Sequence, residues 1–415
     1  MQKTAMPATP APTTIGALTA NRLARIKPSP TLAVTAKANE MKTAGKSVIG
    51  LGAGEPDFDT PEHIKQAAFE AMQRGETKYT PVGGTAAMKK AIAEKFRRDN
   101  NLDYAANEII TGCGAKQVIF NAMLATLNAG DEVIIPAPYW VSYPDMVEFA
   151  EGVPVIVSCP EENHFKLNPA DLDKAITKKT KWVILNSPSN PTGAAYTEKE
   201  LEALAEVFLK HQHVMILADD IYEHLVYDDF TFKTIAQVEP RLRERTLTVN
   251  GVSKAYSMTG WRIGYAGGPA KLISAITDIQ SHSTSNPCSI SQAASVAALN
   301  GPQEFLDDWR VAFAKRRDMV VDGLNAIGGI ECLKPQGAFY VFPSMKKLVG
   351  KKTPDGKIIG NCSQFSEYLL ESVQVAVVFG AAFGMDGYFR ISYATSEQSL
   401  KEALVRIKDA CGKLS

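Results

Sequence analysis

A short apolar strand predicted at Thr246–Val249 is followed by the segment Gly251-Val252-Ser253-Lys254-Ala255-Tyr256-Ser257-Met258-Thr259-Gly260-Trp261-Arg262-Ile263-Gly264. Lys254 stands among small and apolar residues, and the next charged residue is Arg262. Most lysines of soluble proteins are solvated surface charges, but these neighbours favour a buried amine. A lysine and an arginine thus follow one predicted core strand, which makes this segment the first candidate for a chemical site.

The same arrangement of short apolar strands continues upstream, at residues 109–110, 133–135, 182–185 and 214–217. Helices are predicted between the strands. Thr60 and Pro61 predict a helix start, with a hydroxyl cap followed by proline at the first helical position. Thr197 and Glu200 have the spacing of a capping box. Strands separated by helices predict an α/β fold in which a parallel sheet carries helices on both faces.

The pattern changes after residue 302. A long helix is predicted at Glu304–Leu324, and shorter strands are predicted around residues 337–342 and 389–393. This change indicates a second, smaller α+β domain, and a chain of 415 residues is long enough for two domains.

The composition excludes several classes of function. Lys+Arg and Asp+Glu both number 45, so no basic surplus favours nucleic acid. No apolar run approaches the roughly 18 residues of a membrane span. The six cysteines are scattered without a Cys-x-x-Cys pair, so neither a zinc site nor a disulfide framework is predicted. We therefore expect no nucleic-acid partner, no membrane partner and no metal.

Residues 1–20 are rich in Ala, Thr and Pro, with Lys3 as their only charge. This composition favours a flexible N-terminal extension on a cytoplasmic protein. An organellar transit peptide is the alternative, although the arginines typical of such peptides are absent.

A glycine turn, Gly112-Cys113-Gly114-Ala115-Lys116, lies between the strand at 109–110 and an apolar helix. Free N–H groups and the helix dipole make such a turn suitable for a phosphate. A dinucleotide fingerprint would require glycine at position 117, which is Gln117. The turn therefore predicts a phosphate site of a different kind.

Polar residues also follow two other strands. Asn190, in Asn190-Pro191-Thr192-Gly193, is either part of a plain turn or an amide directed at a cofactor oxygen. Asp219 follows the strand at 214–217, and Tyr222 comes three residues later. Asp219 is either a solvated carboxylate or helix cap, or a site residue. Ligands of open α/β sheets bind beyond the carboxyl ends of the strands, which favours the site.

At this point the sequence resembles a known family. Gly-x-Ser-Lys followed by Gly-Trp-Arg-x-Gly resembles the cofactor-lysine signature of class I pyridoxal-phosphate-dependent aminotransferases. The resemblance extends from about Arg25 to the C-terminus and is to the bacterial-type aspartate aminotransferases, a subgroup that includes aspartate/prephenate aminotransferases. Four further blocks carry it: Gly52-Ala53-Gly54-Glu55-Pro56-Asp57-Phe58, Lys78-Tyr79-Thr80-Pro81, Pro138-Tyr139-Trp140-Val141-Ser142-Tyr143 and Phe389-Arg390-Ile391-Ser392-Tyr393-Ala394.

The resemblance implies a fold type I homodimer that binds pyridoxal 5′-phosphate between its domains. The large domain, with a mostly parallel sheet flanked by helices, would cover residues 61–302. The small α+β domain would combine residues 303–415 with the N-terminal segment 21–60.

The resemblance also implies roles for individual residues. Lys254 would bind the cofactor covalently and then move a proton as a general base. Asp219 would keep the pyridine nitrogen protonated, so that the ring accepts carbanion charge. Tyr222 and Asn190 would bond the phenolic oxygen of the ring, and Trp140 would stack on it.

The phosphate would be bound by Arg262 and by the N–H groups of Gly114 and Ala115. Tyr79 would reach it from the neighbouring subunit. Many relatives carry a phosphate-binding serine at position 251, which is glycine here, and Ser253 is a candidate replacement.

Amino-acid and 2-oxo-acid substrates would be bound by Arg390 and the N–H of Gly54 at the α-carboxylate, next to Asn190 and Trp140. Animal-type aspartate enzymes carry an arginine before a Ser-Asn-Pro run, but residues 280–284 contain no arginine or lysine. A second carboxylate therefore needs another cation, and the subgroup implies Lys116 with Thr31.

We therefore expect an aspartate aminotransferase that transfers the amino group between aspartate and 2-oxoglutarate in a ping-pong cycle, with prephenate as a further substrate left open. An aromatic or kynurenine aminotransferase, or another enzyme of this cofactor such as a β-lyase, is the alternative. A cofactor-sensing transcriptional regulator would need a DNA-binding domain, for which about 20 N-terminal residues are too few.

Overall fold

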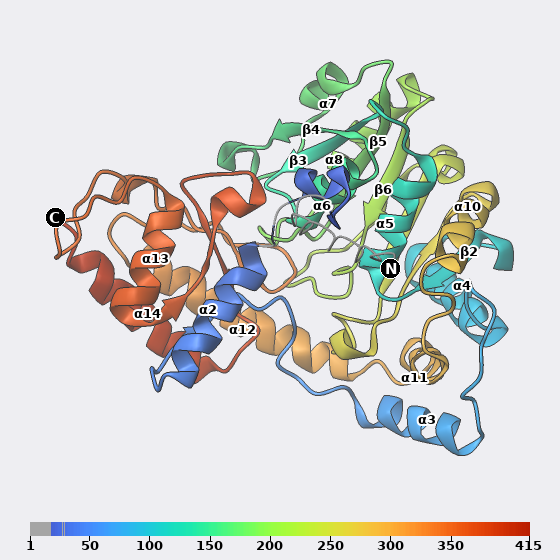
Figure 1. Cartoon of the computed structure of the whole chain (residues 1–415), viewed down its shortest axis with the longest axis horizontal. Helices are drawn as coiled ribbons and strands as arrows, with labels where there is room; N and C mark the ends of the chain where they lie inside the picture. The colour runs from blue at the N-terminus through green and yellow to red at the C-terminus, as the bar shows by residue number, and fades with distance from the viewer. Residues whose placement is uncertain (1–17, 27, 29) are drawn as a thin grey trace, which may run out of the picture.

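A seven-stranded sheet forms the centre of the larger part of the molecule (Figure 1). The computed structural model of the chain describes residues 18–26, 28 and 30–415. In spatial order the strands are β2 (Ile109–Gly112), β8 (Gly264–Gly267), β7 (Thr246–Gly251), β6 (Met215–Asp219), β5 (Thr180–Asn186), β3 (Glu132–Ala137) and β4 (Val153–Ser158). Strand β8 is antiparallel to β2 and β7, and the other neighbours pair in parallel.

Helices cover both faces of this sheet, as predicted. Val133 and Ile135 of β3 pack against one helical layer, whereas Ile134 packs against the other. This alternation follows from the two-residue period of a strand. The helices around the sheet are α3 (Glu62–Gln73), α4 (Ala86–Asn100), α5 (Ala115–Thr126), α6 (Ser142–Phe149), α7 (Pro169–Ala175), α8 (Glu198–Lys210), α9 (Ile235–Val238), α10 (Ala270–Ser281) and α11 (Ser289–Asn300).

Helix α8 begins with the capping box that Thr197 and Glu200 predict. The predicted hydroxyl cap at Thr60 is wrong. Helix α3 begins at Glu62 with Pro61 in the N-cap position, and the Thr60 hydroxyl instead donates to the carbonyl of Ser257 at 2.7 Å. Thr60 thus fastens the chain before α3 to the loop that carries the candidate lysine.

The smaller part combines α2 (Pro30–Thr43), near the N-terminus, with the C-terminal elements, whereas the 3-10 helix η1 (Asn21–Arg25) lies against the large part, where Arg25 pairs with Glu151 at 3.6 Å. Helix α2 shares a small core with α13 (Cys362–Val373) through Ala38, Met41 and Leu370. Figure 1 shows α2 in blue beside the orange-red C-terminal helices. A three-stranded antiparallel sheet and a parallel two-stranded ribbon share its core with two more helices. These elements are β11 (Val378–Phe379), β12 (Phe389–Ser392), β9 (Tyr340–Val341), β1 (Ile49–Gly50), β10 (Val375–Ala376), α12 (Phe305–Asn325) and α14 (Glu397–Gly412).

Helix α12 connects the two parts, because Leu306 packs in the core around α3, α4 and α11 while Phe313 and Val320 pack in the small-part core. The domain limits 61–302, and 21–60 with 303–415, stay a prediction; the packing of α2 and α12 agrees with it, whereas residues 21–25 lie against the large part. The predicted N-terminal extension, residues 1–20, lies almost wholly outside the described residues. In the described part of the chain, no helix combines the length and the apolar character that a bilayer span requires.

Candidate active site

A cavity of about 370 Å³ opens beyond the carboxyl ends of β5, β6 and β7, where the small part meets the sheet. Ligands of open α/β sheets bind beyond the carboxyl ends of the strands, so this cavity has the expected position of a ligand site. The structure brings eleven of the predicted site residues into the lining of this one cavity: Thr31, Gly54, Ala115, Lys116, Trp140, Asn190, Asp219, Tyr222, Lys254, Arg262 and Arg390.

Lys254 lies in the loop after β7, and its Nζ donates to the carbonyl oxygen of Gly54 at 2.5 Å. Burial is the main cause that lowers the pKa of the Lys254 amine to about 8. The charges of Arg262 and Arg390 also lower this pKa, whereas those of Glu55 and Asp219 raise it. A larger share of this amine is therefore neutral near pH 8 than for an ordinary lysine. A neutral amine in a cavity is suited to covalent attack and to proton transfer.

Asp219 ends β6 and is buried. Its Oδ2 accepts a hydrogen bond of 2.6 Å from the hydroxyl of Tyr143, whereas its Oδ1 is buried without a partner. Burial raises the pKa of the Asp219 carboxyl to about 6, although the hydrogen bond from Tyr143 and the charge of Lys254 act in the opposite direction. The unpartnered Oδ1 is an acceptor that a cationic N–H donor in the cavity would satisfy.

Asn186 links two neighbouring strands at the cavity. It is opposite Asp219 in the parallel pairing of β5 with β6, and its Nδ2 donates to the Asp219 carbonyl at 2.8 Å. Its Oδ1 accepts from the backbone N–H of Asn190 at 2.9 Å. Asn186 therefore holds the turn that carries Asn190 against the strand that carries Asp219.

Arg390, on β12, is buried with its guanidinium toward the cavity. Its two terminal nitrogens donate to Asn190 Oδ1 at 2.8 Å and to the Gly52 carbonyl at 2.6 Å, and its Nε has no partner. The guanidinium lies 4.6 Å from the ring centre of Tyr340 and 5.0 Å from that of Phe383. An arginine held in this way offers a planar fork to an anion in the cavity.

The N-terminus of α5 and Arg262 form the end of the cavity that suits a phosphate. Gly114, at φ +86°, precedes the helix, and a Cβ on it would lie 2.5 Å from an Arg262 nitrogen. A Cβ on Gly264 would lie 2.0 Å from the backbone nitrogen of Ala115. Gln117, where a dinucleotide fingerprint has glycine, accepts a hydrogen bond from the Cys113 N–H at 2.6 Å. Glycine is thus required at positions 114 and 264 so that Arg262, strand β8 and the start of α5 can lie close together.

Lys116 lies beside the aromatic wall of the cavity. Its Nζ lies 4.8 Å from the ring centre of Trp140 and donates to the Ser142 hydroxyl at 3.2 Å. Burial lowers the pKa of the Lys116 amine, and the charge of Arg262 lowers it further. This second cation faces the same cavity as Arg390 and Thr31.

Tyr79, another predicted site residue, does not lie at the cavity of its own chain. Its side chain is 93% exposed, in a surface depression with Lys78 and α11 residues. Gly114 is not in the lining itself but adjoins Arg262, and Ser253, the candidate replacement for the missing serine, does line the cavity.

Several lining residues were not predicted from the sequence: Ile119, Val141, Ser142, Tyr143, Asn186, Ile221 and Tyr340. Asn186 directly follows the strand predicted at 182–185, so the preference of ligands for the carboxyl ends of strands could have identified it. Tyr143 and Ser142 lie in a block already noted for its resemblance, but the pattern assigns them no partner. Tyr340 carries no sequence signal.

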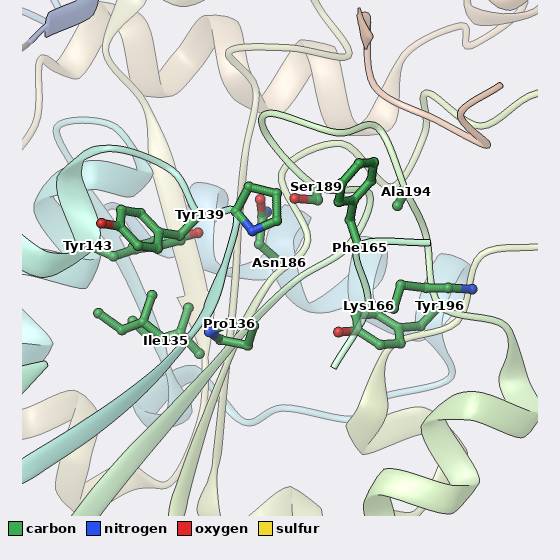
Figure 2. Close-up of a pocket in the computed structure, with 12 residues that line it drawn as sticks. Ile135, Pro136, Tyr139, Tyr143, Phe165, Lys166, Asn186, Ser189, Ala194 and Tyr196 are labelled. Carbon is green, nitrogen blue, oxygen red and sulfur yellow. The ribbon is translucent and has the colours of Figure 1, made fainter. Parts of the chain in front are cut away.

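A second cavity of about 20 Å³ lies behind Tyr143 and Asn186, which line both cavities. Figure 2 shows Tyr139 and Tyr143 on one side of it and Phe165 and Tyr196 on the other. A space of this size accommodates about one water molecule. The larger cavity is therefore the one that can hold a cofactor and a substrate.

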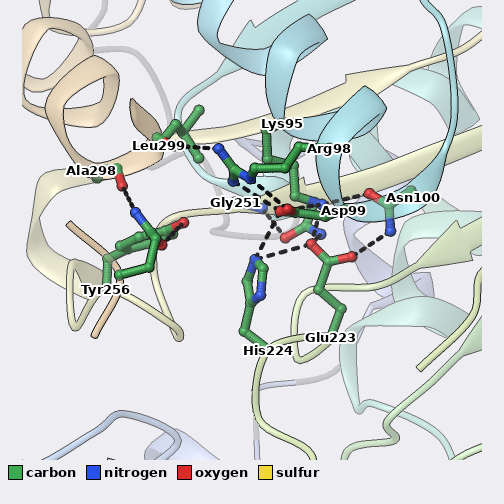
Figure 3. A network of polar contacts seen from close by, with 12 residues as sticks. Lys95, Arg98, Asp99, Asn100, Glu223, His224, Gly251, Tyr256, Ala298 and Leu299 are labelled. Atoms are coloured by element: carbon green, nitrogen blue, oxygen red, sulfur yellow. Dashed lines mark hydrogen bonds and ion pairs between the residues drawn. The ribbon is translucent and has the colours of Figure 1, made fainter. Parts of the chain in front are cut away.

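A buried charged network includes Glu223, which directly follows Tyr222 in the sequence (Figure 3). The fully buried Lys95 pairs with Glu223, which also accepts from Asn100 at 2.7 Å and from Asn250 at 2.8 Å. Ligand atoms of Asp99, Glu223 and His224 lie within 4.8 Å of one another. Lys95 already supplies the positive charge that these acids require, so the cluster is explained as an ion-pair network.

Comparisons with known proteins agree with this geometry. Residues 46–407 match the aminotransferase class I and II family. The aspartate/prephenate aminotransferase of Cereibacter sphaeroides is 59% identical over 399 residues, which cover 96% of this chain and 100% of that protein. The crystal structure of the aspartate aminotransferase from Rhizobium meliloti matches with a TM-score of 0.94 at 59% identity, over 96% of this chain and 99% of that one. The aspartate aminotransferase from Thermus thermophilus with maleate matches with a TM-score of 0.89 at 44% identity, over 94% and 99%. The chain therefore belongs to the class I and II aminotransferases, a family of transaminases that use pyridoxal phosphate.

Proposed function

We propose that this chain is an aspartate aminotransferase that binds pyridoxal 5′-phosphate and transfers an amino group between aspartate and 2-oxoglutarate. One observation carries the proposal: besides Arg262 at the phosphate end, a single cavity contains a lysine of lowered pKa, Lys254, together with two separate cations, Arg390 and Lys116. Two cations suit the two carboxylates of aspartate, glutamate and their 2-oxo acids.

The residues of the cavity fit the cofactor. The buried and unpartnered Oδ1 of Asp219 is the acceptor that a protonated pyridine nitrogen requires. The Gly114 N–H donates to the Gly112 carbonyl at 2.8 Å and the Gln117 N–H to the Gly114 carbonyl at 3.1 Å. The N–H groups of Ala115 and Lys116 at the start of α5, with Arg262, therefore suit the phosphate. Lys254 lies in the same cavity as Asp219. The bound cofactor would supply the electron sink for carbanion charge at the substrate Cα.

The protein residues would orient the substrate and move its proton. Arg390 would bind the α-carboxylate with its planar fork. Its bond to Asn190 engages only the amide oxygen, so the Asn190 NH2 group stays available to donate to the phenolic oxygen of the cofactor. Lys254 would be displaced by the substrate amine and, once neutral, take a proton from Cα. Asp219 would stay ionised beside a positive ring nitrogen, because an opposite charge lowers the pKa of a carboxyl.

Lys116 would bind the second carboxylate, next to Thr31. The relatives support this substrate class, because their names give aspartate and prephenate, and maleate in the Thermus structure is a four-carbon dicarboxylate. Prephenate also carries two carboxylates, so we include it as a further substrate. An aromatic aminotransferase or a β-lyase would not require a second cation at this position.

Replacing Lys116 with methionine tests the second cation, because methionine keeps the apolar stem against Trp140 and removes the charge. We expect kcat/KM for aspartate to fall about 10- to 100-fold, the cost of losing a charged hydrogen bond, and kcat/KM for alanine to change little. The measurement is steady-state kinetics with both amino acids. The matched control is Lys90→Met, since Lys90 is exposed on α4. Equal losses for aspartate and alanine would remove the proposed role of Lys116.

We further propose a homodimer in which Tyr79 completes the phosphate site of the partner. Tyr79 is 93% exposed in one chain, and Phe69 and Met72 of α3 expose large apolar side chains at 50% and 48%. An aromatic ring and apolar side chains exposed on neighbouring elements are typical of an interface.

Light scattering should give twice the chain mass of 45.0 kDa. Tyr79→Phe should keep this mass and weaken cofactor affinity about 3- to 10-fold, because one hydrogen bond to the phosphate is lost. A monomeric wild-type protein would contradict the shared site. So would a Tyr79→Phe variant that binds the cofactor as tightly as the wild-type protein.

We place the enzyme in the cytoplasm. All six cysteines are free thiols, and four of them are buried. Free cysteines without pairing are typical of proteins in a reducing compartment.

A further inference from the structure

Tyr340 occupies a position between the two ends of the site. It belongs to β9, where it is opposite Ser392 of β12 in the antiparallel register. Arg390 is two residues from Ser392 and therefore projects from the same face of the sheet as Tyr340. The Arg390 guanidinium lies 4.6 Å from the ring centre of the fully buried Tyr340. The ring thus supports the arginine that would bind the substrate carboxylate.

The hydroxyl of the same side chain faces the cofactor end. It lies 2.9 Å from the hydroxyl of Tyr222, and either oxygen can be the donor. The two rings meet edge to face, with centres 5.8 Å apart at 83°. A Cβ on Gly54 would lie 3.1 Å from the Tyr340 hydroxyl, so glycine leaves the space that the hydroxyl needs.

The proton count between the two hydroxyls determines their roles once a cofactor is bound. A phenol donates one hydrogen bond and can still accept another. If Tyr222 donates its proton to the phenolic oxygen of the cofactor, its own oxygen can only accept, and Tyr340 must be the donor to Tyr222. This bond strengthens Tyr222 as a donor, because chained hydrogen bonds polarise one another.

We infer that Tyr340 is a positioning residue that orients two groups of the active site, Tyr222 through its hydroxyl and Arg390 through its ring. The inference rests on the proposed function, since it assigns Tyr222 to the cofactor and Arg390 to the substrate. Two other tyrosines of the same core instead bond the backbone. Tyr227 and Tyr393, in the same core, both direct their hydroxyls to the carbonyl of Ala338.

Tyr340→Phe removes the hydroxyl and keeps the ring. We expect the pKa of the linkage between Lys254 and the cofactor to rise by about half a unit to one unit, because a weaker Tyr222 donor stabilises the phenolate less. The charged groups that face this linkage, Glu55, Asp219, Arg262 and Arg390, stay in place. Cofactor affinity should fall about 3- to 10-fold. Both are measured on the holoenzyme without substrate, by pH titration of its visible absorbance and by cofactor binding.

Tyr393→Phe is the matched control, because it also removes one buried hydroxyl from the small-part core, where the hydrogen bond to Ala338 is 3.2 Å. This control should leave the linkage pKa unchanged. If Tyr340→Phe behaves like Tyr393→Phe, the role of the hydroxyl is overturned.

A double variant tests whether Tyr340 acts through Tyr222. In a Tyr222→Phe background the acceptor for the Tyr340 hydroxyl is absent, so adding Tyr340→Phe should produce no further rise in the linkage pKa. An additive rise would overturn the proposed path.

The ring is tested separately with Tyr340→Leu. Loss of the cation–π contact should raise the KM for aspartate and glutamate about 10-fold beyond that of Tyr340→Phe, while the cofactor affinities of the two variants stay similar. Equal KM values would overturn the support of Arg390. Thermal unfolding of the apoenzymes identifies any variant that fails to fold. If Tyr340→Leu does not fold, Tyr340→Met, which also removes the ring but fills the core with a flexible side chain, takes its place. A wild-type protein without visible absorbance would refute the proposed cofactor, and normal spectra with no aspartate turnover would refute only the proposed substrate.

Discussion

Replacement of Lys254 by alanine is expected to lower kcat with aspartate and 2-oxoglutarate by about 10⁴-fold or more, since the covalent anchor and the general base are lost together. The visible absorbance of the lysine-bound cofactor should disappear, while free cofactor added to the variant should still bind through Asp219 and Arg262. Steady-state kinetics and an absorbance spectrum measure the two effects.

Lys89 provides a control for this experiment. Burial lowers the pKa of its amine as well, but it lies on α4 outside the cavity. Lys89→Ala should keep both the spectrum and the activity. An unchanged visible spectrum in Lys254→Ala would mean that another amine binds the cofactor.

Arg390→Ala is the second substitution with a large expected effect. The variant loses the buried guanidinium that would pair with the substrate α-carboxylate. We therefore expect kcat/KM for every amino-acid substrate to fall about 100- to 1,000-fold, mainly through a higher KM. The cofactor should remain bound, because the residues that would bind its phosphate lie at the other end of the cavity. Kinetics with aspartate and alanine measure the effect on substrate binding, and the visible spectrum shows whether the cofactor stays bound.

Arg390→Lys distinguishes the contribution of the planar guanidinium group from that of its positive charge. Lysine keeps the charge but cannot bind two carboxylate oxygens in one plane, so we expect an intermediate loss. If Arg390→Ala instead loses its cofactor and keeps a normal KM, Arg390 belongs to the phosphate end and the assignment of the two arginines is reversed.

Much of the large sheet could be predicted from the sequence because its parallel strands are buried on both faces. Segments such as Val133–Ile135 and Trp182–Leu185 are then continuously apolar, which is a strong signal. Strand β8 was not predicted. In its sequence, Gly264-Tyr265-Ala266-Gly267, only Tyr265 belongs to the residues favoured in strands. Its glycines are needed for packing, because a Cβ on Gly267 would lie 2.4 Å from the ring of Tyr104.

Helix ends were predicted unequally. The capping box of α8 is a local contact within one turn, so Thr197 and Glu200 suffice to predict it. Thr60 has the same local signal before Pro61, but its hydroxyl bonds Ser257, 197 residues away in the sequence. A tertiary partner of this kind is invisible to a local pattern.

The candidate site divides in the same way. Residues that follow strands or lie in a recognisable block, such as Lys254, Asp219 and Arg390, were predicted, and the structure brings them together. Tyr143 and Tyr340 were not, because each acts through a partner that only the tertiary fold places beside it: Asp219 at 2.6 Å and Tyr222 at 2.9 Å.

The central claim is that one cavity accepts dicarboxylic amino acids and transfers their amino group. A single-turnover experiment tests it most directly: the yellow holoenzyme is mixed in turn with aspartate, glutamate, alanine, phenylalanine and kynurenine, and the visible band is followed. We predict rapid loss of the band with aspartate and glutamate, and its recovery on adding 2-oxoglutarate, oxaloacetate or prephenate. No loss with the dicarboxylates, or release of pyruvate and ammonia without recovery by a 2-oxo acid, would contradict the account.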